Sequence, residues 1–158
     1  MWVFKKTLNK RYLIFYLLFS VTIVSCQANK IRDRYEQIND LTRLYFNADY
    51  EKGKDIIERI IDICSMHTSP NIVWIYYGRL YVLERNEGNV ENAELAFIKS
   101  KYWFVRFLED QGLSNDEIFT GVIDFTPELL KKKIQKLDEA GKRNTKIYEE
   151  LIQLEKKQ

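Results

Sequence analysis

The sequence predicts an all-α fold in which antiparallel helix pairs are stacked and a C-terminal helix caps the stack. Apolar residues recur with helical spacing along most of the chain, and alternating strand patterns are absent. Proline occurs only at Pro70 and Pro127, where it separates helices. With 158 residues, the chain is long enough for one domain with a hydrophobic core.

The first two predicted helices cover residues 31–46 and 50–66, with the turn NADY between them. Each carries one apolar stripe at helical spacing, as expected for a helix with one buried face. The first stripe consists of Ile31, Tyr35, Ile38, Leu41, Leu44 and Tyr45, and the second of Ile56, Ile57, Ile60, Ile61 and Cys64.

The next two predicted helices cover residues 72–85 and 90–110. The turn between them, RNEGN, contains Gly88, which can adopt a positive φ. The expected buried residues are Trp74, Tyr77, Tyr81 and Val82 in one helix and Ala93, Ala96, Phe97, Phe104 and Phe107 in the other.

Two further helix starts follow Gly112. Ser114 and Glu117 have the spacing of a capping box, and Thr126 precedes Pro127 as an N-cap precedes a first helical residue. Gly141 either ends this last helix or only weakens it, and the sequence leaves both options open. The last segment carries an apolar stripe of Leu130, Ile134, Leu137, Ile147, Leu151 and Leu154, which we expect to cap the end of the stack.

Part of this pattern resembles the tetratricopeptide repeat. WIYYGRLY matches the first helix of that repeat through Trp74, Tyr77, Gly78 and Tyr81, and AELAFIKS matches the second through Ala93, Phe97 and Ser100. A weaker copy precedes it, with Gly53 at the small position but Leu41 where glycine is usual. The resemblance covers about residues 35–100, and a plain helical bundle is the alternative.

The resemblance implies two structural features. Gly78 and Ala93 face each other between the third and fourth helices, with Trp74 and Phe97 buried beside them. The first helices of such repeats line a concave, partner-binding face, which here is open and consists of Ile72, Ile75, Arg79 and Val82.

The N-terminus resembles the signal peptide of bacterial lipoproteins. A basic start is followed by a short apolar run, residues 12–24, and by Ile23, Val24, Ser25 and Cys26. The resemblance implies that Cys26 is lipidated with palmitate and other acyl chains, and that cleavage occurs before it. An ordinary signal peptide and an uncleaved anchor are the alternatives. The expected division is residues 1–25 as signal peptide, 26–30 as lipidated cysteine and tether, and 31–158 as helical domain.

Charge and cysteine content limit the function classes. The chain has 25 basic and 23 acidic residues, and cleavage would remove four basic residues to leave a net charge of −2. This balance predicts no nucleic-acid partner. Cys64 would then be the lone thiol, which we expect to be buried, and no metal-ligand spacing surrounds the single His67.

The sequence contains no catalytic motif, so we expect no enzyme, no catalytic residue, no metal and no cofactor. Acid pairs such as Glu149 and Glu150 are typical of solvated helix faces. The leading hypothesis is a lipid-anchored module that binds an envelope protein or peptide, facing the periplasm from the outer membrane. The alternatives are a surface lipoprotein without a groove, or a periplasmic ligand-binding or transporter-associated lipoprotein. A ligand would use an aromatic cluster of Tyr76, Tyr77, Tyr81, Tyr102, Trp103 and Phe104.

Overall fold

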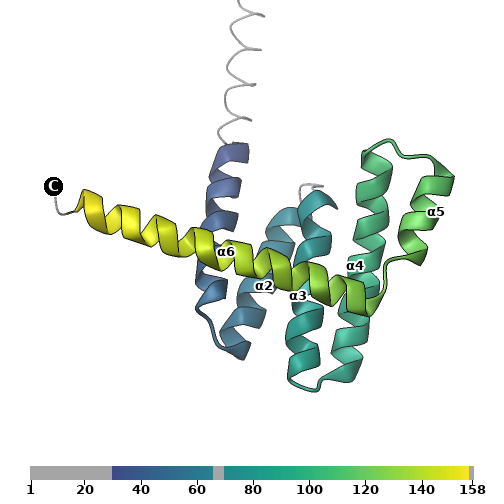
Figure 1. Cartoon of the computed structure of the whole chain (residues 1–158), viewed down its shortest axis with the longest axis horizontal. Helices are drawn as coiled ribbons and strands as arrows, with labels where there is room; N and C mark the ends of the chain where they lie inside the picture. The colour runs from purple at the N-terminus through teal and green to yellow at the C-terminus, as the bar shows by residue number, and fades with distance from the viewer. Residues whose placement is uncertain (1–29, 66–69, 157–158) are drawn as a thin grey trace, which may run out of the picture. The chain divides into compact units, whose positions relative to one another are not determined.

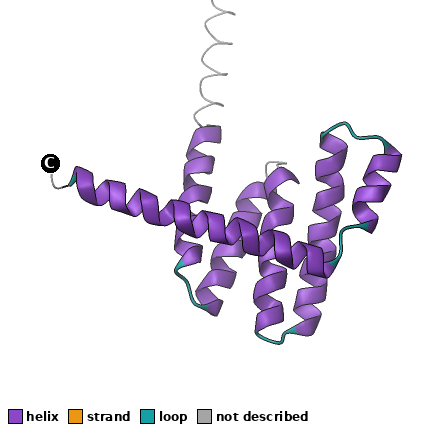
Figure 2. Ribbon diagram, in the orientation of Figure 1, coloured by secondary structure: helices purple, strands orange, loops and turns teal. Residues whose placement is uncertain are grey.

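The computed structural model describes residues 30–65 and 70–156. The chain divides after Gln37, so residues 30–37 are described apart from the compact unit that begins at Ile38. Within the described residues all regular structure is helical (Figure 2). These residues form six helices with antiparallel packing contacts, which confirms the predicted all-α class.

The helices lie close to their predicted positions. The first covers residues 30–46, and α2 (Tyr50–Ser65), α3 (Pro70–Asn86), α4 (Val90–Asp110), α5 (Asn115–Ile123) and α6 (Pro127–Glu155) follow (Figure 1). The first four match their predicted bounds to within two residues. Proline begins both α3 and α6, because the first turn of a helix does not need the missing N–H.

Local capping explains where the last two helices begin. The Ser114 side chain accepts a hydrogen bond from the Glu117 N–H at 3.4 Å, and the Glu117 carboxylate accepts one from the Ser114 N–H at 2.8 Å. This reciprocal pair is the predicted capping box. The Thr126 hydroxyl likewise accepts from the Leu129 N–H at 3.2 Å. Gly141 does not end α6, which continues through it as one helix.

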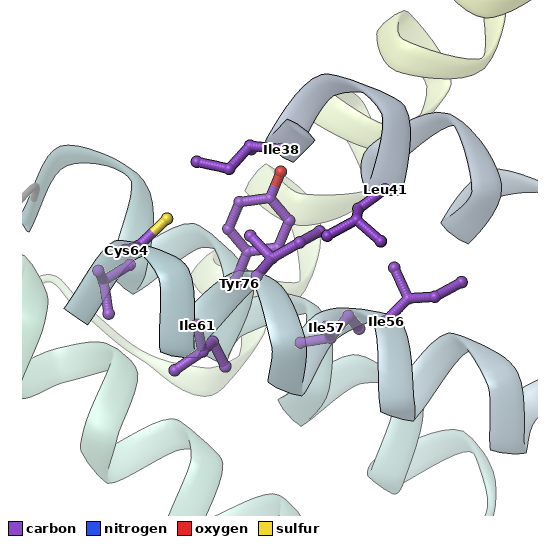
Figure 3. Packing of buried hydrophobic residues seen from close by; sticks show 9 residues of the cluster. Ile38, Leu41, Ile56, Ile57, Ile61, Cys64 and Tyr76 are labelled. Carbon is purple, nitrogen blue, oxygen red and sulfur yellow. The ribbon is translucent and has the colours of Figure 1, made fainter. Parts of the chain in front are cut away.

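One hydrophobic cluster joins the first helix, α2 and α3 (Figure 3). The Thr42 and Tyr76 hydroxyls share a hydrogen bond of 2.6 Å at its edge. Cys64 is buried as predicted, but Leu44 is 60% exposed, so the predicted stripe of the first helix is only partly buried. The buried members of the cluster are Ile38, Leu41, Ile56, Ile57, Ile60, Ile61, Cys64, Val73 and Tyr76.

A second cluster joins α3, α4 and α6 around Phe125, which is 2% exposed. Phe125 stacks on Phe104 with 4.5 Å between ring centroids. The Ser100 hydroxyl donates a 2.8 Å hydrogen bond to the Trp74 carbonyl, so α3 and α4 approach closely there. The cluster consists of Trp74, Tyr81, Ala93, Ala96, Phe104, Leu108, Phe125, Leu130 and Ile134.

The closest neighbour of Gly78 is α6, and the expectation that Gly78 faces Ala93 is wrong. A Cβ added at Gly78 would lie 2.8 Å from Ile134 and 2.9 Å from Leu130. Both of these side chains are fully buried, so α6 packs directly on α3 at this glycine. Ala93 is buried elsewhere in the same cluster. The small residue therefore permits a helix crossing that the repeat pattern does not predict.

Candidate interaction surface

The predicted partner-binding face on α3 is not open. Arg79 is 6% exposed, and Ile72, Ile75 and Val82 are half-buried. Ile72 packs against the first hydrophobic cluster, and Ile75 and Val82 pack against the second. These four residues therefore belong to the edge of the core. Partner binding by them stays a prediction, and the Arg79 side chain is not accessible to such a partner.

Arg79 is held by an ion pair with α6. Its Nε donates to the Asp138 Oδ1 at 2.8 Å, and the two side chains are only 7% and 18% exposed. The Tyr45 hydroxyl donates to the other Asp138 oxygen at 3.3 Å. Burial, and then the nearby Asp138 carboxylate, raise the pKa of the Tyr45 hydroxyl. The Arg79 guanidinium also lies over the Tyr76 ring, 4.7 Å from its centroid, so its charge is compensated on several sides.

The C-terminal helix thus occupies the face that was expected to remain free. It contacts α3 at Gly78 and at Arg79, one residue apart. The expectation that the tail only caps the end of the stack is therefore wrong. Replacing Ile75 and Arg79 with Glu would bury new carboxylates, one of them beside Asp138, and we expect unfolding instead of a selective loss of binding.

A second buried charge, Glu84, is also fully engaged within the fold. Its side chain is 2% exposed and lies 2.8 Å from the Lys54 ammonium. It accepts hydrogen bonds from the Tyr50 hydroxyl at 2.7 Å and the Asn89 amide at 2.9 Å. Burial alone would raise the pKa of the Glu84 carboxyl, but the hydrogen bonds from Lys54, Tyr50 and Asn89 outweigh it and hold the pKa below its ordinary value. This network joins α2 to the turn before α4, which is a structural role.

The outward face of α4 carries an apolar stripe that the sequence analysis missed. Leu95, Ile98 and Tyr102 are 52%, 62% and 58% exposed. Their spacing of three and then four residues places them on one side of the helix. The opposite side, which contains Ala93, Ala96 and Ser100, is buried. We call these three exposed residues the α4 stripe. Their spacing was visible in the sequence, but only the position of α3 shows which side of α4 stays free.

The aromatic residues nominated for ligand binding mostly fill the core. Tyr76, Tyr81 and Phe104 are at most 8% exposed. An open hollow of about 290 Å³ lies between the first helix and α6, and both polar and apolar side chains line it. Its lining residues are Asn39, Thr42, Arg43, Phe46, Gly141, Asn144, Thr145 and Tyr148. Neither feature is the large apolar cavity that a carrier of apolar ligands needs.

Some predicted features are not placed by the structure. Cys26, the whole N-terminal segment and His67 lie outside the described residues. In the described part, Glu149 and Glu150 are exposed, and no group of three His, Cys, Asp or Glu side chains is close enough to hold a metal. No helix among residues 30–65 and 70–156 is long and apolar enough to cross a membrane.

The fold and its surface define a class, an all-α domain with two buried hydrophobic clusters and an apolar outward face on α4. No known protein family, curated protein or solved structure matches this chain.

Proposed function

We propose that the chain is a lipid-anchored, non-catalytic module that binds a protein partner in the bacterial cell envelope. The α4 stripe carries this proposal. A helix with apolar residues on opposite sides is normally buried on both, and the described helices cover α4 on one side only. Contiguous exposed apolar residues commonly mark interaction sites. The partner surface that fits the stripe is apolar and reaches Leu95, Ile98 and Tyr102 together.

The scaffold of this module is a short tetratricopeptide-like array. Small residues at close helix contacts support this part of the proposal. Ser100 is fully buried and bonds to the Trp74 carbonyl across α3 and α4. Gly53 is buried in α2, and a Cβ there would lie 3.7 Å from both Tyr45 and Leu83. Both residues stand at the small positions that suggested the repeat.

Membrane attachment is the second part of the proposal and rests on the lipobox-like sequence before Cys26. Radiolabelled palmitate should enter the native chain and fail to enter Cys26→Ser, which should accumulate as the longer precursor. Fractionation should place the native chain in the outer membrane. An unlabelled native chain, or a Cys26→Ser chain of mature size, would refute the lipid anchor.

Site-specific photocrosslinking in native membranes tests the α4 stripe. A photoreactive residue at Ile98 should give an adduct with one other protein, because Ile98 lies at the centre of the stripe. The same probe at Asn92, an exposed residue about 120° around α4 from Ile98, is the matched control. Leu95→Ser with Tyr102→Ser should abolish the Ile98 adduct and leave the thermal midpoint within about 2 °C, because surface changes cost little. Equal adduct yields at Ile98 and Asn92 would contradict the proposal.

A further inference from the structure

The C-terminal half of α6 carries a second apolar stripe, and its large side chains are exposed. Leu137, Ile147 and Leu151 are 40%, 55% and 54% exposed. Leu137, Ala140, Asn144, Ile147 and Leu151 follow one another at intervals of three, four, three and four residues. This alternation is the a and d spacing of a coiled coil. We call these five residues the α6 seam.

The attachment of α6 to the rest of the domain leaves the α6 seam accessible. A different flank of the helix faces inward, because Asp138 pairs with Arg79 and Thr145 is buried. Gly141 lies against Phe46, and the Tyr148 ring lies under the Arg43 guanidinium at 3.9 Å. These four α6 residues occupy the b and e positions of the same heptads. The a and d positions lie beside this inward flank, where Asn144 borders the hollow next to the first helix and remains exposed.

From this geometry we infer that the α6 seam binds a second copy of the chain as a parallel two-stranded coiled coil. The central residue Asn144 identifies the occupant. A single asparagine at an a position specifies register and a two-stranded state, because its amide is matched by the same amide of an identical, in-register helix. An apolar helix from an unrelated protein would leave the Asn144 amide unpaired in the interface.

The length of the α6 seam sets the expected strength of the dimer. From Leu137 to Leu151 the helix rises about 21 Å, which is only two heptads. The contact is therefore weak in dilute solution and is best detected by covalent capture. The e positions beside the α6 seam, Gly141 and Tyr148, already pack on the first helix. Charge pairs between e and g positions of two copies therefore contribute little, and Asn144 sets the register of the two helices.

Disulfide capture tests this inference in the full-length chain. Ile147 occupies a d position, and identical d residues face each other across a parallel seam at disulfide distance. Under mild oxidation, Ile147→Cys should give at least fivefold more covalent dimer than Lys146→Cys, its exposed neighbour outside the seam. The parent chain supplies the background from Cys26 and Cys64. Adding Leu151→Asp should return Ile147→Cys to that background.

Asn144→Val separates the dimer from a chance collision. Removing the polar a residue should raise the dimer yield of Ile147→Cys, because asparagine specifies the pair at a cost in stability. All the substituted residues are exposed, so the fold should be retained. Equal yields from Ile147→Cys and Lys146→Cys would overturn the inference. Preferential pairing of Leu137→Cys with Leu151→Cys in mixed chains would show an antiparallel pair and overturn it as well.

Discussion

The buried pair of Arg79 and Asp138 should stabilise the attachment of α6 far more than a surface ion pair would. Asp138→Ala leaves the Arg79 guanidinium without its carboxylate in a site that is only 7% exposed. Breaking a buried pair on one side typically costs about 3–5 kcal/mol. We expect about 3 kcal/mol here, because the Tyr76 ring still lies over the guanidinium and Asp138 is partly accessible.

Replacing both partners should restore most of that stability. In Arg79→Met with Asp138→Leu neither charge is left alone, and apolar replacement of a buried pair is often neutral or stabilising. We therefore expect the unfolding free energy of the double variant to lie within about 1 kcal/mol of that of the native chain. The two changes should be strongly non-additive, which is the signature of a direct contact.

Urea unfolding followed by far-UV circular dichroism measures these free energies, with a constant m-value as the condition for comparing them. Glu139→Ala is the matched control, because Glu139 is the exposed neighbour of Asp138 in α6. It should change the unfolding free energy by no more than about 0.5 kcal/mol. A loss below about 1 kcal/mol in Asp138→Ala, similar to that control, would refute the placement of α6 over α3.

Three other substitutions or measurements test separate parts of the fold. Gly78→Ala should lower the thermal midpoint, because the new methyl group meets buried Leu130 at 2.9 Å. Gly53→Ala finds ordinary contacts at 3.7 Å and should raise the unfolding free energy by up to about 1 kcal/mol. Similar thermal midpoints for the two variants would contradict the close packing of α6 on α3 at Gly78. Because the pKa of Glu84 is lowered in the folded state, its carboxylate contributes stability above about pH 4.5 that is lost as the pH falls through the folded-state pKa. Glu84→Gln should therefore make the unfolding free energy depend less on pH in the acidic range. An unchanged pH dependence would exclude this contribution of Glu84. Burial raises the pKa of the Cys64 thiol to about 11, so alkylation of Cys64 should occur only when the chain unfolds. Mass spectrometry measures this alkylation. Rapid labelling of Cys64 in the native chain would show that the core around it is open.

Local signals in the sequence were sufficient to predict the helices. Ser114 with Glu117, and Thr126 with Pro127, mark helix starts through hydrogen bonds between near neighbours, and these bonds are present in the structure. The burial of Cys64 followed from the spacing of the isoleucines in its own helix. Such features depend on a few consecutive residues, so a single sequence contains enough information about them.

The position of α6 depends on pairs of residues far apart in the chain. Gly78 and Arg79 looked like parts of a repeat and its open groove, and nothing nearby shows that Asp138 approaches them. Helical periodicity shows which side of a helix is apolar, but it does not show which element covers that side. For the same reason the α4 stripe was missed, since its exposure depends on which side of α4 the other described helices cover.

The contacts of α6 with both α3 and the first helix have a consequence for how this helical domain should unfold. Linear repeat arrays lose stability one unit at a time, because each unit contacts only its neighbours. Here Asp138 bonds to both Arg79 and Tyr45, and Gly141 lies against Phe46, so α6 links the first helix to α3 in addition to their direct contact at Thr42 and Tyr76. Partial unravelling from either end must break those ties. The domain should therefore open as one unit, and amide protons of residues 38–46 and of α3 should exchange in one cooperative opening.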